Sequence, residues 1–259
     1  MTSPNSPTPA SGNAVQTIVD DVLRSRKAVR AFRATPVPQA LVAEILDVAR
    51  SAPSNSNSQP WRVHVLVGES KRLFSEALLR SHERDDLPPS PHFPRDLPQA
   101  CKLRQADFGA RYYAALGIDR DDAQARYRQT GRNYLFFDAP VGLIFTIDDR
   151  LTRHSWADYG IFLQTLMIAA KARGLDTCPQ VSFVRHQPVI QALLRLPVGQ
   201  SVVCGMSLGY ADDDSRLNKL AVPREPVEKF AVFWGFDRDP REAQNPAASP
   251  SLLGSEAAP

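Results

Sequence analysis

The sequence predicts an α+β fold in which helices pack on a central sheet. Segments with strand periodicity are interspersed with segments of helical periodicity, and the longest and most apolar helix, expected over 154–174, lies between strands. No GxGxxG follows a strand and no GxxxxGK[ST] is present, so neither a dinucleotide-binding nor a P-loop motif is indicated. With 259 residues, 43% of them apolar, the chain can bury one sizeable core.

Apolar periodicity predicts the helices. In the first helix Val15, Ile18 and Val22 recur at helical spacing, and in the longest one Gly174 supplies a stop signal. Helices are expected over 14–26, 38–51, 70–80, 99–116, 121–134, 154–174 and 188–195.

Alternation and β-branched residues predict the strands. "WRVHVLVG" (61–68) alternates apolar and polar side chains, and "PVGLIFTI" (140–147) is apolar enough to be buried on both faces. Further strands are expected at 200–210 and near 229–234. The proline-laden "RDDLPPSPHFPRDLP" predicts an irregular connection.

The ends of the chain differ in composition from its middle. Residues 1–13 and 240–259 are rich in Pro, Ala and Ser, which predicts disordered tails around a single folded domain over 14–239. No apolar run approaches the ~20 residues of a membrane helix, and the first residues lack the pattern of a signal peptide. We therefore expect a cytoplasmic protein without a membrane partner.

Charge and cysteine content exclude other classes. The net charge of +3 is mild and spread along the chain, so composition gives no sign of a nucleic-acid partner. The three cysteines, Cys101, Cys178 and Cys204, are widely spaced, which indicates a reducing compartment and neither a disulfide framework nor a metal cluster.

Three segments carry candidate chemistry, and each has a plain structural explanation too. "RSRKAVRAF" (24–32) places cations at a helix end, where the helix dipole and solvent favour them, or where arginines could clamp a phosphate. "APSNSNSQPW" (52–61) is either a polar surface turn or a cradle for a ligand rich in hydrogen-bonding groups. "GLDTCPQVSF" (174–183) leaves the longest helix, and Pro179 opposes regular structure there.

No acid–base or nucleophile constellation stands out. Cys178 has no histidine at a suitable spacing, so we do not expect it to be a nucleophile. The acidic pairs lie in predicted loops and helix starts, where they are expected to be caps or solvated turns.

Taken together and in order, these segments and "SLGYADDDSRLNKLAVPREP" (207–226) resemble the FMN-dependent nitroreductase family over about residues 16–234. The resemblance implies a nitroreductase-like α+β sandwich with a mixed, mostly antiparallel central sheet. It implies an intertwined homodimer with FMN at the interface, NADH or NADPH as electron donor, and a variable helical excursion over about 82–134 that covers the substrate. A protein whose cofactor supplies the reactive atom needs no catalytic triad and no metal.

The resemblance also implies roles for individual residues. Arg26 and Lys27 would bind the phosphate of FMN, with Arg224 as a second ligand, and Arg30 would face the N1/C2-carbonyl edge of the ring. The complete set of implied FMN contacts is Arg26, Lys27, Ala28, Arg30, Pro53, Ser54, Asn57, Gln59, Asn133, Pro179, Gln180, Val181 and Arg224.

Within that set the loop and the later segments have separate roles. Pro53, Ser54, Asn57 and Gln59 would reach FMN from the other subunit. Asn133 would meet the pyrimidine edge, and a backbone N–H of the segment 179–181 would meet N5.

This sequence departs from the family pattern at Ala28, Val181 and Val222. Ala28 stands where a serine is common, which removes one hydroxyl from the phosphate region. Val181 replaces an acidic residue of one branch, and Val222 stands where some members carry a lysine. These departures leave the fine list of flavin contacts open.

Tyr112, Tyr113, Tyr127 and Tyr134 are candidates to stack on an aromatic substrate, and core packing explains each of them equally well. The implied function is two-electron, ping-pong reduction of a nitroaromatic or quinone through flavin N5. Alternatives are a same-fold flavoenzyme acting in enone reduction, reductive dehalogenation or dehydrogenation, and a non-enzymatic binder of anions or nucleic acid that uses the arginines of 24–33.

Overall fold

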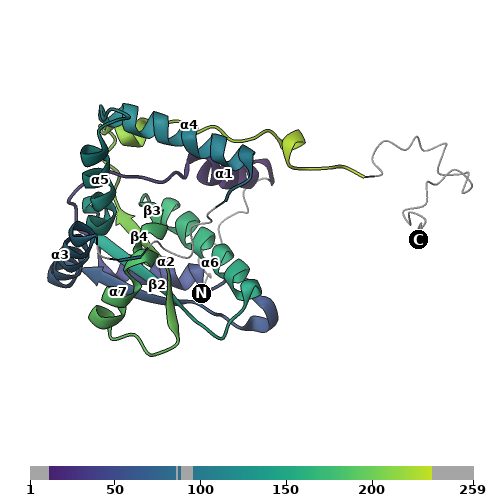
Figure 1. Ribbon diagram of the computed structural model, residues 1–259. Coiled ribbons are helices and arrows are strands. Elements are labelled where there is room, and N and C mark those ends of the chain that lie inside the picture. Colours follow the sequence, from purple (N-terminus) through teal and green to yellow (C-terminus); the bar gives the residue numbers. More distant parts are fainter. Residues whose placement is uncertain (1–11, 86, 89–95, 235–259) are drawn as a thin grey trace, which may run out of the picture. The chain divides into compact units, whose positions relative to one another are not determined.

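The computed structural model describes residues 12–85, 87–88 and 96–234 (Figure 1). The predicted tails therefore lie almost entirely outside the described residues. The chain divides into two units, Met1–Leu220 and Ala221–Pro259. The first unit contains the sheet, the long helices and nearly all the residues discussed below.

A four-stranded sheet forms the centre of the first unit. Its strands are β1 (Arg62–Val67), β2 (Val141–Asp148), β3 (Asp176–Gln180) and β4 (Gln200–Gly209). They lie in the order β1-β2-β4-β3, and every pairing of neighbours is antiparallel. The strands predicted at 61–68, 140–147 and 200–210 are confirmed, and β2 is buried along almost its whole length, as its apolar composition predicts.

Two expectations about strands are wrong. The segment 174–183 contains β3 despite Pro179, because β3 is an edge strand, where a missing N–H need not break a ladder. Near 229–234 no strand forms, and the described residues there carry only a short 3₁₀ helix, Val227–Lys229. Alternating apolar residues make a segment able to pair, but a strand forms only where a neighbour supplies hydrogen bonds.

The predicted helices are confirmed with small shifts in their ends. They are α1 (Gly12–Ser25), α2 (Gln39–Ala49), α3 (Gly68–Arg84), α4 (Gln99–Leu116), α5 (Ala123–Gly131), α6 (Arg153–Lys171) and α7 (Gln187–Leu194). Short 3₁₀ helices lie between these elements or, for η4, after β4: η1 (Asn55–Asn57), η2 (Arg132–Asp138), η3 (Val181–His186) and η4 (Arg216–Lys219). In the segment predicted helical over 121–134, α5 passes directly into η2.

The two faces of the sheet have separate cores. Because side chains alternate along β2, Leu143 and Phe145 point to a core shared with α2 and α6, and Ile144 points to a core shared with α3, η2 and η3. Figure 1 shows α2 and α6 on one side of the sheet and α3 and α7 on the other. This layered arrangement is the α+β sandwich that the sequence predicts.

Glycines bring aromatic rings against the second face of the sheet. A Cβ on Gly142 would lie 2.6 Å from Cζ of Phe136, and one on Gly205 would lie 2.4 Å from Cδ2 of Phe183. Only hydrogen at these positions lets the rings approach the strands so closely. The contact fixes η2 against the sheet, and η2 carries part of the candidate site.

Among the described residues, no helix combines the length and the apolar content needed to cross a membrane.

Candidate functional site

The segment after α1 links three of the four motifs. The N–H of Val29 donates to the carbonyl of Thr177 in β3 at 3.0 Å. The N–H of Arg33 donates to the carbonyl of Tyr210 at 2.9 Å, just beyond β4. The structure therefore places "RSRKAVRAF" between the segment 174–183 and the start of the fourth motif.

Asn218 holds this arrangement together. The residue is only 2% exposed, and its Oδ1 accepts the N–H of Arg30 at 2.9 Å. Its Nδ2 donates to the carbonyls of Ala31 and Asp212, each at 2.8 Å, and the amino group of Lys27 donates to its backbone carbonyl. Asn218 could not be picked out from the sequence, because an asparagine in a polar loop gives no signal until its partners are known.

The cations of the first motif have different environments. Nε of Arg26 is buried and has no hydrogen-bond partner in the part of the chain that the structure describes. Arg33 pairs with Asp213 at 2.7 Å, and Arg24 pairs with Asp20 at 3.3 Å. A half-buried arginine whose buried Nε is an unused donor fits an anionic group such as a phosphate.

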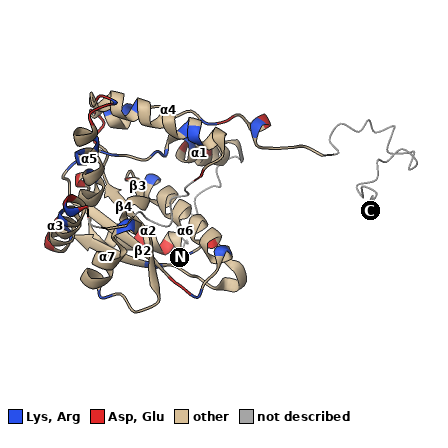
Figure 2. Ribbon diagram, viewed as in Figure 1, with Lys and Arg blue, Asp and Glu red and all other residues tan. Residues whose placement is uncertain are grey.

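The pairing of Arg24 and Arg33 bears on nucleic-acid binding. Figure 2 shows basic and acidic residues interspersed along the helices. The arginines of the first motif thus do not form one uncompensated basic surface in the described residues, which gives no support to the nucleic-acid alternative.

A cavity of about 390 Å³, here called the inner pocket, lies between α4, α5 and η2. Its lining includes Arg30, Phe108, Tyr112, Tyr113, Asn133 and Phe137. Four residues predicted from the resemblance, two as flavin contacts and two as substrate contacts, are therefore brought together: Arg30, Asn133, Tyr112 and Tyr113. Phe108 and Phe137 join them and were not predicted.

Arg30 is held against two aromatic rings of the inner pocket. Its guanidinium carbon lies 5.2 Å from the ring centroid of Phe108 and 5.3 Å from that of Tyr112. The hydroxyl of Tyr112 accepts a hydrogen bond from Nε2 of Gln129 at 2.8 Å, and burial raises the pKa of Tyr112. The pocket thus combines aromatic walls, a fixed cation and a tyrosine that stays protonated at neutral pH.

A buried network positions Asn133. Gln180 is 3% exposed, and its Nε2 donates to the backbone carbonyl of Asn133 at 2.7 Å. The hydroxyl of Ser207 lies 2.8 Å from both Oε1 of Gln180 and the carbonyl of Phe136. The side chain of Gln180 is therefore satisfied inside the protein, whereas its neighbours Pro179 and Val181 are exposed.

The backbone of η2 adopts a conformation that L-residues rarely take. Phe136, Phe137 and Asp138 have φ values of 53°, 51° and 65°. Left-handed, non-glycine residues carry strain and persist only where their surroundings hold them. Here the turn lets Phe136 pack against the sheet while Phe137 lines the inner pocket.

The other two tyrosines lie outside the inner pocket's lining. Tyr134 is 2% exposed and packs edge-on against His186, with the ring centroids 4.5 Å apart, and burial raises its pKa to about 12. Tyr127 stacks on His82 at 4.1 Å, and its hydroxyl donates to the carbonyl of His82. Packing accounts for both positions, and a substrate role for either remains a prediction.

The loop of the second motif is exposed and internally braced. The hydroxyl of Ser54 accepts the N–H of Gln59 at 3.0 Å, and Nε2 of Gln59 donates to Oδ1 of Asn57 at 3.0 Å. The N–H of Asn55 donates to Asp158 of α6 at 3.1 Å. Figure 1 shows the loop beside the lower end of α6, apart from α4 and α5, so within one chain it does not join the inner pocket.

Neither Arg224 nor Cys178 lines the inner pocket. Arg224 lies in the second unit, where its guanidinium donates to the carbonyl of Val222 at 3.0 Å, and its phosphate role stays a prediction. Cys178 is buried, which raises its pKa to about 11, so the thiol stays protonated at neutral pH and is a poor nucleophile. Among the described residues no cluster of His, Cys, Asp and Glu could hold a metal ion.

Comparison with known proteins places this geometry in context. The sequence model of the nitroreductase family matches residues 23–210. The chain is 52% identical to a 4-nitrobenzoate reductase of Pseudomonas putida, over 85% of this chain and 96% of that protein. It is 44% identical to a nitrobenzene nitroreductase of Ectopseudomonas oleovorans, over 83% and 96% respectively.

A solved structure gives the same picture at the level of the fold. The FMN-dependent nitroreductase NfnB from Mycobacterium smegmatis, crystallised in complex with NADPH, superposes with a TM-score of 0.81 at 32% sequence identity. The superposition covers 85% of this chain and 99% of that one.

Proposed function

The chain belongs to the nitroreductase family, and we propose that it is an FMN-dependent oxidoreductase that takes electrons from NADPH or NADH and reduces nitroaromatic compounds. The observation that carries the proposal is the inner pocket, in which the cation Arg30 and the amide of Asn133 meet the aromatic side chains of Tyr112 and Phe108. An electron-poor aromatic acceptor suits such walls, since aromatic rings stack face to face or edge to face.

The residues present fit an FMN group. The unpartnered Nε of Arg26 and the amino group of Lys27 lie next to each other in sequence and suit the phosphate dianion. We assign Arg30, Asn133 and the segment that contains the exposed residues Pro179 and Val181 to the ring system. Ala28 lies between these phosphate and ring ligands in sequence and forms a β-bridge with Thr177. It has no polar side-chain group, so it could contribute backbone groups only.

A bound FMN would supply the redox chemistry of a ping-pong cycle, as the acceptor of a hydride and the donor of two electrons. The chain's own residues stabilise charge, orient the reacting ring and exclude water. Arg30 provides a fixed positive charge that stabilises negative charge developing in the site. Phe108, Tyr112 and Phe137 orient an aromatic ring and exclude water.

The lining of the inner pocket contains no acidic residue, histidine or cysteine among the described residues. This composition favours a reaction in which the cofactor, and not a side chain, supplies the reacting atom. Nitroaromatics are the first acceptor class that we assign, because two relatives of the chain carry nitroaromatic reductase names. Quinones, which are also planar and electron-poor, are the second.

We further propose that the working form is a homodimer. Asn57 and Gln59 are exposed and Ser54 is half-buried, in a loop that does not reach the inner pocket of its own chain. In a homodimer this loop would complete the FMN site of the neighbouring subunit, which accounts for polar groups facing outward.

The proposal is tested with the purified full-length chain. We expect an oxidised-flavin absorbance spectrum, bleached by anaerobic NADPH or NADH and restored by 4-nitrobenzoate or nitrobenzene. Dialysis against FMN-free buffer at high salt, followed by re-addition of FMN, is expected to lower and then restore thermal stability, since a ligand of the native state stabilises it. A colourless protein that gains no stability from FMN would overturn the proposal. A flavin that neither donor bleaches would instead favour a same-fold enzyme of different chemistry.

A further inference from the structure

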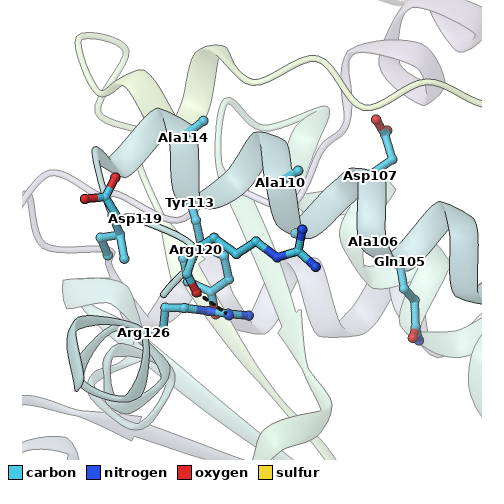
Figure 3. Close-up of a pocket in the computed structure, with 11 residues that line it drawn as sticks. Gln105, Ala106, Asp107, Ala110, Tyr113, Ala114, Asp119, Arg120 and Arg126 are labelled. Carbon is cyan, nitrogen blue, oxygen red and sulfur yellow. Dashed lines mark hydrogen bonds between the residues drawn. The ribbon is translucent and has the colours of Figure 1, made fainter. Parts of the chain in front are cut away.

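A second cavity lies next to the inner pocket and has no role in the function proposed so far. It has a volume of about 790 Å³ and lies between α4, the connection after it and the start of α5 (Figure 3). Its lining includes Gln105, Gly109, Tyr113, Asp119, Arg120 and Arg126. We call it the outer pocket.

The two pockets share one wall. Gln105, Gly109 and Tyr113 line both of them. Gly109 lies inside α4, where glycine costs about 1 kcal/mol relative to alanine. A Cβ at Gly109 would meet nothing within 4 Å, so close packing does not require glycine there. Because Gly109 has no side chain, no side chain at this position separates the two pockets, and a ligand could extend from one pocket into the other.

Two guanidinium groups make the outer pocket suitable for anions. The guanidinium carbon of Arg126 lies 4.5 Å from the ring centroid of Tyr113, and its Nη1 donates to the backbone carbonyl of Arg120 at 3.0 Å. Neither Arg120 nor Arg126 has an ion-pair partner among the residues that the structure describes.

The acidic side chains of the outer pocket leave this charge largely uncompensated. Asp107 is bound by Arg111, with Nε and Oδ2 2.8 Å apart. Figure 3 shows the carboxylate of Asp119 pointing away from the guanidinium groups of Arg120 and Arg126, which extend beneath α4. The pocket therefore presents two forked donors to an incoming anion.

The sizes of the two pockets suggest a ligand of two parts. The inner pocket, at about 390 Å³, suits one aromatic ring, and its aromatic walls match that role. The outer pocket, at about 790 Å³, lies within the usual range of small-molecule sites and far exceeds what a single carboxylate on an aromatic ring would fill. Reduced nicotinamide dinucleotides consist of a flat ring joined to a large, phosphate-bearing adenosine half.

We propose that the outer pocket binds the phosphate-bearing adenosine half of the nicotinamide donor, with Arg126 and Arg120 as phosphate ligands. The nicotinamide ring then enters the inner pocket across Gly109, and Tyr113 forms the wall between the two halves. This assignment rests on the proposed function, because it takes the donor to be NADPH or NADH.

Binding to the oxidised, FMN-loaded protein tests the proposal without turnover. Adenosine 2′,5′-bisphosphate carries the phosphates but no nicotinamide, and its affinity is measured by calorimetry. We expect Arg126→Gln to weaken it by about ten- to a hundredfold, the size expected for losing a charge-assisted hydrogen bond. Arg126→Lys keeps the charge but not the forked donor geometry, and its affinity is expected to lie between those of the wild type and Arg126→Gln. The matched control is Arg128→Gln, an exposed position of α5 outside both pockets, and it should bind as the wild type does.

Anaerobic reduction of the bound flavin provides the second readout. For Arg126→Gln we expect the dissociation constant of NADPH to rise by about tenfold or more. The reduction by 1-benzyl-1,4-dihydronicotinamide, which has no phosphate, should be unchanged. NADH separates the two sources of phosphate: an effect on NADPH alone assigns Arg126 to the 2′-phosphate, and an equal effect on both assigns it to the diphosphate.

The outcomes that overturn the inference differ from those that overturn the function. Unchanged binding of adenosine 2′,5′-bisphosphate and NADPH in both Arg126→Gln and Arg120→Gln would remove the outer pocket from donor binding. An equal loss with NADPH and with the benzyl donor would do the same, because it would indicate a general disturbance of the inner pocket. If no donor reduces the flavin of the wild type, the proposed function fails instead.

Discussion

A single buried asparagine connects the cationic segment to the rest of the site. Asn218 uses both atoms of its side-chain amide: Oδ1 accepts from Arg30, and Nδ2 donates to the carbonyls of Ala31 and Asp212. The backbone of Arg30 is thereby fixed beside the inner pocket, next to the rings of Phe108 and Tyr112. A buried amide with every group satisfied specifies one position for its neighbours.

We predict that Asn218→Ala lowers the free energy of unfolding by about 1–3 kcal/mol, because the N–H of Arg30 loses its acceptor, Oδ1 of Asn218. The carbonyls of Ala31 and Asp212 each lose one donor and keep the N–H groups of Asp212 and Ser215. It should also release FMN more readily, as Arg30 loses its fixed position. Chemical denaturation and flavin content after gel filtration measure the two effects. Arg216→Ala, at an exposed position of the same 3₁₀ helix, serves as control. Unfolding free energy and flavin content equal to those of the wild type would contradict this account of Asn218.

Individual residues show where prediction from the sequence succeeds and where it stops. The resemblance supplied Arg30, Asn133, Tyr112 and Tyr113, and the structure brings these four to one pocket. Asn218 and Phe137 were not predicted. The position of Asn218 depends on hydrogen bonds to distant residues, and that of Phe137 depends on a left-handed backbone, and no local sequence pattern indicates either. Tyr127 and Tyr134 have the same residue type as the pocket tyrosines, and only their packing on His82 and His186 separates them.

At the scale of elements, the spacing of apolar residues predicted the helices and most of the strands. The helices and three of the four strands have the expected positions because their apolar spacing reflects burial on one face or on both. Strand β3 was missed since Pro179 argues against a strand, whereas its place at the sheet edge removes the objection. The prediction for the segment 229–234 was wrong in the opposite direction: the segment has the composition of a strand, but no strand forms there.

The loop between α2 and β1 is an element whose conformation is already set in the single chain. Hydrogen bonds of Gln59 to Ser54 and Asn57 brace it, and Ser56, Asn57 and Gln59 hold left-handed φ values. Such bracing keeps exposed polar groups in a fixed arrangement, which lowers the entropy cost of binding a ligand.

We predict that the double variant Ser54→Ala, Asn57→Ala retains FMN less well than the wild type, by about tenfold in dissociation constant, since two polar contacts are lost. The sheet and α6 should keep their stability, because the contact from Asn55 to Asp158 remains. Fluorescence titration with FMN and circular dichroism separate the two effects. Ser58→Ala, in the same exposed loop, is the control. Unchanged FMN affinity in the double variant would take the loop out of the flavin site.

At the scale of the whole molecule, the first helix presents an apolar face that its own chain leaves exposed. In α1, Val15 is 50% and Ile18 is 61% exposed, and Val19 and Leu23 extend the same face. A row of large apolar side chains along one helix is more typical of an interface than of a free surface. Together with the outward-facing loop of residues 53–59, it supports the proposed homodimer.

We predict that the wild type has the mass of two chains in sedimentation velocity and that Ile18→Glu shifts it toward one chain, because a charge would be buried in the interface without a partner. The monomer should lose FMN at the same time, since Ser54 and Asn57 would no longer reach the neighbouring subunit. Thr17→Glu adds the same charge to α1 at an exposed position on the side opposite this apolar face and should leave both mass and flavin content unchanged. Loss of flavin and loss of the dimer should follow one concentration dependence, because each site would need both chains. A wild-type monomer that holds FMN would contradict a shared site, and an Ile18→Glu dimer with full FMN content would remove α1 from the interface.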